Sequence, residues 1–267
     1  METTAVPIDA TRTPRLLDYA PPPLLLRERV ILVTGAGSGI GSALAEAAAG
    51  CGATVILLGR TISKLEAVYD RIVGGGGPEP AIYPMNLESA TWKDYEELPD
   101  RLDQEFGRLD GLVHNAALFH YLTPLAQHDL PLWARTLHVN LTVPFLITRA
   151  CLPLLESAPA ASVVFVSDSV GRRGEAYWGA YGVSKFALEG LMQIFAQEVE
   201  ANTGIRANTL DPGPVRTPMR ARVYPQEPEG AARDAAAVVP AFLYLLGDDS
   251  RGLSGRALTV DDPLHAA

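Results

Sequence analysis

Short apolar runs alternate along the chain with longer segments in which apolar residues recur at helical spacing. The runs at 30–33, 53–58, 81–85, 109–114, 162–166, 205–210 and 257–260 have the length of strands buried on both faces. Helices are expected at 39–50, 61–73, 90–106, 130–156, 178–202 and 231–246. This alternation predicts an α/β fold built on a doubly wound parallel sheet, with helices on both faces.

The pattern predicts one folded domain, over residues 28–267, behind an N-terminal extension. Residues 1–27 are expected to be poorly structured, because Pro7, Pro14 and the three prolines at 21–23 break regular structure. The leucine run at 24–26 is expected to pack on the domain. No internal repeat or second-domain boundary is visible.

Charge and hydropathy narrow the classes of partner. The net charge is −9, whereas a general binder of phosphate backbones should be basic, so no nucleic-acid partner is expected. The uninterrupted apolar runs are as long as strands, well short of the ~20 residues of a membrane span. The N-terminus lacks a basic-then-apolar signal pattern, so we expect a cytoplasmic protein with no membrane partner.

Cysteines and histidines indicate neither a disulfide nor a metal site. Cys51 and Cys151 lie far apart in helix-like contexts, which favours reduced core thiols. The histidines stand at positions 114, 120, 128, 138 and 265 without metal-ligand spacing. No bound metal is therefore expected.

A glycine-rich segment, Thr-Gly-Ala-Gly-Ser-Gly-Ile-Gly at 34–41, follows the first predicted strand and opens the first helix. Small residues let backbone N–H groups approach an anion, and a helix N-terminus favours negative charge. No Lys-Ser/Thr pair follows Gly41, so the segment is not a P-loop. It predicts a dinucleotide phosphate site, against the alternative of a tight turn that uses glycine only to reverse the chain.

The end of the second predicted strand bears on the choice of nucleotide. An acidic residue there would bind the ribose diol of NAD, but Gly59 and Arg60 occupy the place. A guanidinium can bind a 2′-phosphate that an acid would repel. Arg60 therefore predicts NADPH in preference to NADH, against the alternative of a solvated surface arginine.

Tyr181 and Lys185 lie four residues apart on a predicted helix and therefore share one face. A cation at ~4–5 Å from the phenol is worth roughly 3–4 kcal/mol at an effective dielectric near 20, which lowers the phenol pKa by about 2–3. Such a pair could serve as a general acid or base. The spacing alone is common in helices, and the glycine segment upstream gives it weight.

These motifs in this order resemble the short-chain dehydrogenase/reductase family over residues 28–262. The resemblance rests on segment 34–41, Asn115-Ala116-Ala117, Asn140, the Tyr181/Lys185 pair and Asp211-Pro212-Gly213. Residues 170–181 are similar to the bacterial YciK-like branch of that family. The resemblance implies a single-domain Rossmann-type sheet of about seven strands in a three-layer α/β/α arrangement.

The resemblance also implies an activity and a set of site residues. The protein would be an NADP(H)-dependent oxidoreductase that transfers hydride between nicotinamide and a carbonyl/alcohol substrate. Tyr181 would exchange the proton, Lys185 would tune it and hold the nicotinamide ribose, and Asn140 would hold a relay water. The implied cofactor-binding residues are Thr34, Gly35, Ser38, Gly39, Ile40, Gly41, Arg60, Asn86, Leu87, Asn115, Ala116, Ala117, Lys185, Pro212, Gly213, Val215 and Thr217. A homodimer or homotetramer is expected.

One position departs from the family pattern. The family has a serine thirteen residues before the tyrosine, and Asp168 stands there, flanked by Ser167 and Ser169. An ionised carboxylate accepts but does not donate a hydrogen bond, and at ~5 Å it costs a developing alkoxide about 3 kcal/mol. Asp168 could be protonated and donate, the backbone could shift to present Ser167 or Ser169, or catalysis could be weak.

Weak catalysis would imply an alternative function. The alternative is a non-catalytic or weakly catalytic NADP(H)-binding protein with a redox-sensing or scaffold role. Arg172, Arg173, Tyr177 and Trp178 are expected beside the substrate entrance, either contacting an anionic or aromatic substrate or packing the loop. Residues 217–229 lie where the family has a mobile substrate lid.

Overall fold

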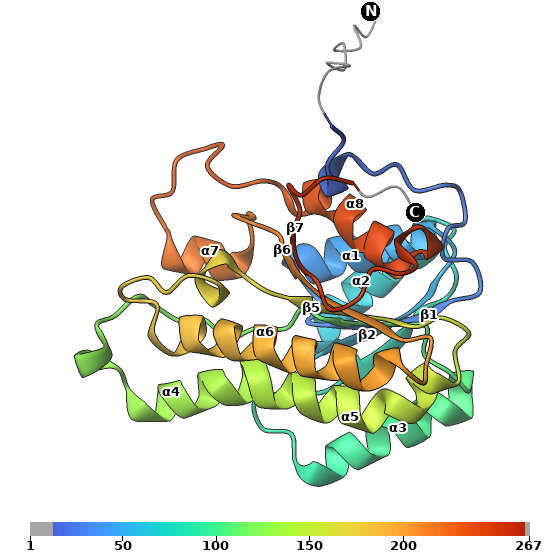
Figure 1. The fold of residues 1–267 in the computed structure, drawn as a ribbon, viewed down its shortest axis with the longest axis horizontal. Helices are drawn as coiled ribbons and strands as arrows, with labels where there is room; N and C mark the ends of the chain where they lie inside the picture. Colours follow the sequence, from blue (N-terminus) through green and yellow to red (C-terminus); the bar gives the residue numbers. More distant parts are fainter. Residues whose placement is uncertain (1–12, 265–267) are drawn as a thin grey trace, which may run out of the picture.

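The computed structural model describes residues 13–264 and has a seven-stranded sheet at its centre (Figure 1). The strand order is β3-β2-β1-β4-β5-β6-β7, and every pairing is parallel. The strands are β1 (Val30–Thr34), β2 (Thr54–Gly59), β3 (Ala81–Pro84), β4 (Gly111–His114), β5 (Ser162–Val166), β6 (Arg206–Asp211) and β7 (Ala257–Thr259). The predicted fold class is confirmed.

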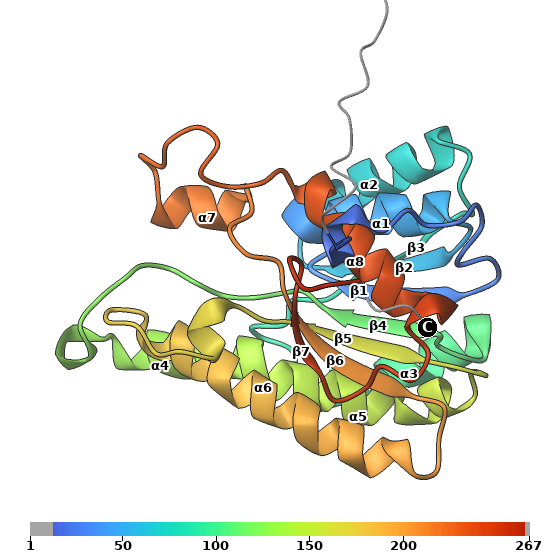
Figure 2. The same cartoon turned by 45° about the horizontal axis from the view of Figure 1, so that its top comes forward.

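Helices cover both faces of the sheet (Figure 2). One layer contains α1 (Gly39–Gly50), α2 (Ile62–Gly74) and α8 (Ala235–Leu246), and the other contains α3 (Trp92–Phe106), α4 (Leu130–Leu137), α5 (Val143–Glu156) and α6 (Gly179–Glu200). Alternate strand residues serve the two layers. Ile31 and Val33 join the core under α1 and α8, whereas Leu32 and Val163 join the core under α3, α5 and α6. The core therefore lies on both sides of the central strands, as a parallel sheet requires.

The segment 130–156 differs from the single regular helix that its pattern predicts. A five-residue π-helical turn, η3 (His138–Thr142), separates α4 from α5. Pro144 supplies a physical reason, because it has no N–H to donate to the Asn140 carbonyl four residues earlier. The wider turn is closed instead by the Val143 N–H, which donates to the His138 carbonyl.

The combined segment Leu130–Glu156 is also long and apolar enough to cross a membrane, with a mean hydropathy of 1.3 in its best window. The core helix of a globular domain passes the same test. Here α5 packs on α3, and α4 packs on α6, within the lower layer of Figure 2. The whole segment therefore meets the length and hydropathy of a membrane-spanning helix, although its uninterrupted apolar runs are too short to do so.

Residues 13–27 pack on the domain more closely than their prolines predict. Leu16 and Leu26 are fully buried, and Arg15 forms a β-bridge with Pro263. The Tyr19 hydroxyl donates to Asp249 at 2.7 Å. Apolar burial and backbone pairing with the C-terminal segment outweigh the breaking effect of the prolines. Residues 1–12 lie outside the described part of the chain.

Candidate active site

A cavity of about 360 Å³ opens beyond the carboxyl ends of β1, β2, β4, β5 and β6. Its lining includes the predicted residues Gly35, Ser38, Gly39, Ile40, Arg60, Asn86, Leu87, Asn115, Ala116, Ala117, Ser167, Asp168, Tyr181, Lys185, Pro212, Gly213, Val215 and Thr217. Residues from the start and from the second half of the chain therefore meet in one space. This is where ligands bind in doubly wound sheets.

The glycine segment forms the turn from β1 into α1. Gly35 and Gly39 have φ angles of +68° and +57°, which side chains rarely adopt. Thr34 is buried and does not line the cavity, but its hydroxyl accepts from the backbone N–H groups of Asn115 and Ala116 at 3.0 Å. It thereby joins the ends of β1 and β4. Thr34 is a positioning residue here.

Gly41 lies behind the turn, and its role can be tested by adding one carbon. A Cβ there would lie 2.6 Å from the Asn115 amide nitrogen and closer still to the Gly35 carbonyl oxygen. Gly41→Ala is therefore expected to lower the free energy of unfolding by about 1–3 kcal/mol through overpacking, and to weaken nucleotide binding. Gly50→Ala, in the same helix with no atom within 4 Å, is the matched control and should be neutral or stabilising. Urea unfolding measures both, and equal stability in the two variants would contradict the expectation.

The end of the cavity beside β2 and α2 is basic. Arg60 lies just before Thr61, the N-cap of α2, and Lys64 stands in the first turn of that helix; all three line the cavity. Two cations and a helix N-terminus together suit a phosphate group. Lys64 was not among the predicted cofactor-binding residues, although its place four residues after Arg60 was a usable signal.

The other end of the cavity is formed by residues of α6 and by residues at the end of β5. The Lys185 Nζ donates to the Val166 carbonyl at 2.6 Å and lies 5.4 Å from the centre of the Tyr181 ring. The Tyr181 hydroxyl donates to the Asp168 carboxylate at 3.2 Å. The structure therefore brings a phenol, an ammonium and a carboxylate together at the cavity wall.

The protonation equilibria differ from the one that the Tyr181/Lys185 spacing predicts. Burial raises the pKa of Tyr181 well above its usual value, and the charges of Asp168 and Asp211 raise it further. Burial lowers the pKa of Lys185 to about 8, against the opposing effect of the nearby carboxylates. The expected lowering of the phenol pKa is not found, because desolvation and the charges of Asp168 and Asp211 raise it.

Comparison with known proteins identifies the chain. The family model for short chain dehydrogenases matches residues 29–228. The chain belongs to the short-chain dehydrogenase/reductase family. It is 42% identical to the uncharacterized oxidoreductase YciK of Escherichia coli K12 over 239 residues, which are 90% of this chain and 94% of that protein.

Solved structures of family members agree with the fold. A short-chain dehydrogenase from Pseudomonas syringae is 51% identical, with a TM-score of 0.89, over 91% of this chain and 98% of that one. A short-chain dehydrogenase from Escherichia coli CFT073, solved in complex with NADPH, is 42% identical, with a TM-score of 0.86, over 90% and 99% of the two chains. The predicted family and its YciK-like branch are confirmed.

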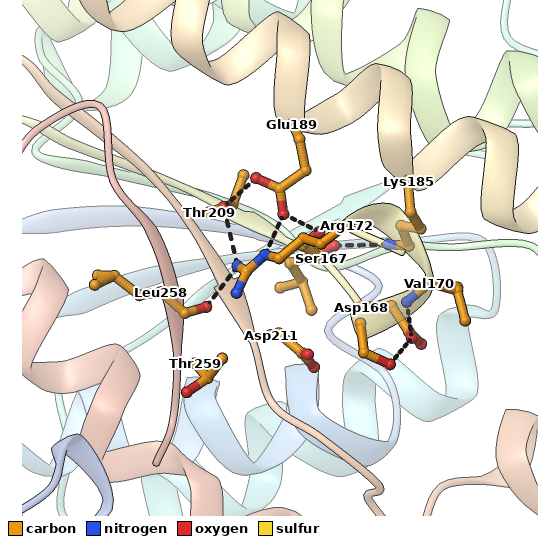
Figure 3. Close-up of polar contacts among 12 residues, drawn as sticks. Ser167, Asp168, Val170, Arg172, Lys185, Glu189, Thr209, Asp211, Leu258 and Thr259 are labelled. Carbon is orange, nitrogen blue, oxygen red and sulfur yellow. Dashed lines mark hydrogen bonds and ion pairs between the residues drawn. The ribbon is translucent and has the colours of Figure 1, made fainter. Parts of the chain in front are cut away.

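Asp168 occupies the place of the family serine, as counting thirteen residues back from Tyr181 predicts. The Ser167 hydroxyl donates to Glu189 at 2.6 Å rather than to Tyr181. The Val170 N–H donates to the Asp168 carboxylate at 3.1 Å (Figure 3). The Ser169 hydroxyl donates to the same oxygen at 3.3 Å. Neither serine hydroxyl bonds to Tyr181, so the arrangement favours Asp168 over a shifted serine.

Asn140 lies within the π-helical turn and does not line the cavity. Its amide nitrogen donates to the Leu118 carbonyl and to the Ser184 hydroxyl, both at 3.0 Å, and its oxygen accepts from the Leu118 N–H at 2.7 Å. The side chain therefore ties the segment after β4 to the helix that carries Tyr181. Its role as the anchor of a relay water stays a prediction.

The predicted lid contains a short helix, α7 (Pro218–Val223), which begins where the Thr217 hydroxyl accepts from the Arg220 N–H. Met219 and Val223 pack on a small cluster of Phe119, Val170 and Tyr181. The Arg220 guanidinium forms a bidentate ion pair with Glu227. Arg220 and Arg222 also line the cavity, together with Phe119 and Met219.

The side chains of the loop before α6 have different surroundings, and none of Arg172, Arg173, Tyr177 and Trp178 lines the cavity. Trp178 stacks on Phe119 with ring centres 5.1 Å apart, whereas Tyr177 and Arg173 are exposed. Arg172 points away from the cavity to Glu189, which supports the packing reading of this residue. Sequence reasoning placed the loop near the site but could not assign these directions.

Within residues 13–264, no group of three or more His, Cys, Asp or Glu side chains is placed to hold a metal ion. Cys51 and Cys151 are free thiols. His265 lies outside the described residues.

Proposed function

We propose that this family member is an NADP(H)-dependent oxidoreductase that acts on a carbonyl/alcohol pair, with Tyr181 as its general acid or base. One observation carries the proposal: a single cavity joins a phosphate-binding glycine turn and two cations to a tyrosine–lysine pair. The nucleotide would supply or accept the hydride. The protein would supply the proton and hold the reacting groups in place.

The residues present fit NADP(H). The turn at Gly35 and Gly39 leaves room for a pyrophosphate beside the start of α1, where Gly41 lets the backbone pack closely. Arg60 and Lys64 can bind the 2′-phosphate, and no acidic side chain ends β2 to oppose it. The NADPH complex of the related Escherichia coli protein supports the same choice.

The remaining expectations concern assembly and location. We propose that the protein acts in the cytoplasm on a small-molecule substrate as a homodimer or homotetramer, without a nucleic-acid or membrane partner. The acidic net charge of −9 supports the exclusion of nucleic acid. Sedimentation of the purified protein would count its subunits.

A second candidate function is NADP(H) binding with little or no turnover. The contact from the Tyr181 hydroxyl to Asp168 favours it, because the raised pKa of Tyr181 makes the phenol a poor proton donor. The two candidates agree on nucleotide binding. They differ in whether turnover exists and depends on Tyr181.

Arg60→Asp tests the choice of nucleotide. The guanidinium is expected to contribute about 2–3 kcal/mol to 2′-phosphate binding, so the variant should bind NADPH on the order of 30- to 150-fold more weakly. NADH affinity should be kept or improved, because a carboxylate can accept from the ribose diol. Fluorescence titration with each nucleotide measures both constants.

Arg256→Asp is the control for this change of charge, since Arg256 is exposed and lies before β7, outside the cavity lining. It should leave both affinities unchanged. An Arg60→Asp variant that keeps the wild-type preference for NADPH would refute the assignment of Arg60. A wild-type protein that binds neither nucleotide would refute the proposed function itself.

A further inference from the structure

Three consecutive residues at the end of β5 and its continuation each contact α6. The Val166 carbonyl accepts from Lys185, the Ser167 hydroxyl donates to Glu189, and the Asp168 carboxylate accepts from Tyr181. Their partners on α6 are spaced four residues apart and therefore share one helix face. The end of the strand is thus fixed to the helix residue by residue.

Glu189 is a buried acid on α6 that does not line the cavity. Its side chain is 8% exposed, and its carboxylate accepts from Ser167 at 2.6 Å and from Thr209 of β6 at 2.7 Å (Figure 3). Arg172 donates to it at 3.1 Å and also donates to the Leu258 carbonyl of β7 at 2.7 Å. Hydrogen bonds and a counter-charge satisfy this buried carboxylate, and they connect β5, β6 and β7.

The contact to Ser167 also decides what Tyr181 meets. Successive side chains of an extended segment point to opposite sides. Because Glu189 holds Ser167 on the scaffold side, Asp168 points to the cavity and reaches the Tyr181 hydroxyl. A rotation that presented the Ser167 hydroxyl to Tyr181 would leave the Glu189 carboxylate short of a buried donor.

We propose that Glu189 and Arg172 form a positioning pair, which holds the end of β5 against α6 and sets the electrostatic environment of Lys185. The inference rests on the proposed function for its catalytic meaning, but not for its test. Neither residue touches the reacting groups. The pair acts through the contact of Glu189 to Ser167 and through its charges.

The charged and titratable groups around Lys185 come from several elements. Asp168 follows β5, Asp211 ends β6, Glu189 and Tyr181 lie on α6, and all three carboxylates raise the pKa of the ammonium against its burial. Arg172 adds a cation beside Glu189, and Arg220 of α7 lies near Asp168 and Tyr181. Glu189 is therefore one of a defined set of charges around Lys185, and removing its charge should lower the Lys185 pKa.

The chain offers a direct readout, because its lysines are Lys64, Lys93 and Lys185 alone. With ¹³Cε-labelled lysine, NMR of the full-length protein follows three signals, which Lys64→Arg and Lys93→Arg variants assign. Glu189→Gln keeps the shape and removes the charge, so the Lys185 pKa is expected to fall by about 1 pH unit. Arg172→Gln removes the opposing charge and should raise it.

Two matched variants control the measurement. Glu198→Gln makes the same change at an exposed site on α6 and should leave the Lys185 pKa unchanged. Arg172→Lys keeps the cation, adds a fourth lysine signal to the three, and should return the Lys185 pKa to a value near that of the wild type. Opposite shifts from the two members of one ion pair are not a result of general loosening of the structure.

The proposal is overturned if folded Glu189→Gln or Arg172→Gln protein leaves Lys185 titrating as the wild type does. Arg172 is partly exposed, so its variant keeps the test readable if Glu189→Gln does not fold. The titration needs neither substrate nor nucleotide. Failure of the proposed function would appear as absent nucleotide binding, and failure of this inference as an unmoved lysine pKa.

Discussion

Tyr181→Phe is expected to lower turnover by a factor on the order of 10²–10⁴ and to leave the affinity for NADPH unchanged. The substitution removes the only hydroxyl of the Tyr181/Lys185 pair and keeps the ring. That ring stacks on Phe119 with centres 4.4 Å apart, so the cavity wall should keep its packing. The effect should fall on the rate of proton transfer rather than on nucleotide binding.

The measurement combines a fluorescence titration with a screen of carbonyl and alcohol substrates. Tyr121→Phe is the control, because Tyr121 is exposed after β4 and does not line the cavity. Retained turnover in Tyr181→Phe would transfer the acid/base role to another group, with Asp168 as the neighbour at 3.2 Å. Nucleotide binding without turnover in the wild type would favour the non-catalytic candidate.

Most of the helices and strands could be predicted from local patterns in the sequence. Apolar runs and helical periodicity give each element its type, and the glycine turn after β1 follows from its own residues. The order of the strands in the sheet was not predicted and comes from the structure alone. The turn at Asn140 was missed because a proline inside a long apolar pattern does not show whether the helix bends, widens or breaks.

The chemistry of the site depends on contacts that sequence spacing does not contain. The spacing of Tyr181 and Lys185 was read correctly as proximity, but the pKa of Tyr181 depends on burial and on Asp168 and Asp211 from other elements. The pair of Glu189 and Arg172 is likewise invisible in sequence, since its members meet only after the loop folds back onto α6. Spacing identifies neighbours on one helix, whereas burial and cross-element charges require the folded chain.

Asp168→Ser is expected to raise the rate of alcohol oxidation near pH 8 by a factor on the order of 10². Burial, then the charge and hydrogen bond of Asp168, raise the pKa of Tyr181. Oxidation needs ionised Tyr181 to accept the proton, so below that pKa the rate rises about tenfold per pH unit. The Asp168 carboxylate lies 3.2 Å from the phenol oxygen, closer than the ~5 Å at which a charge is worth about 3 kcal/mol. Its removal should therefore lower the pKa of Tyr181 by at least about 2, and the rate should level off at a lower pH.

Asp168→Asn separates charge from hydrogen bonding in this prediction, because it removes the charge and keeps the shape. A gain shared by the Ser and Asn variants would show that the carboxylate opposes ionisation of Tyr181. A gain confined to Ser would show that a hydroxyl donor is what the position lacks. A loss of turnover in both variants would contradict the prediction and assign Asp168 a direct role in the reaction, beside the Tyr181 hydroxyl at 3.2 Å. The pH dependence of the rate in the three proteins therefore decides whether this carboxylate opposes the tyrosine or works with it.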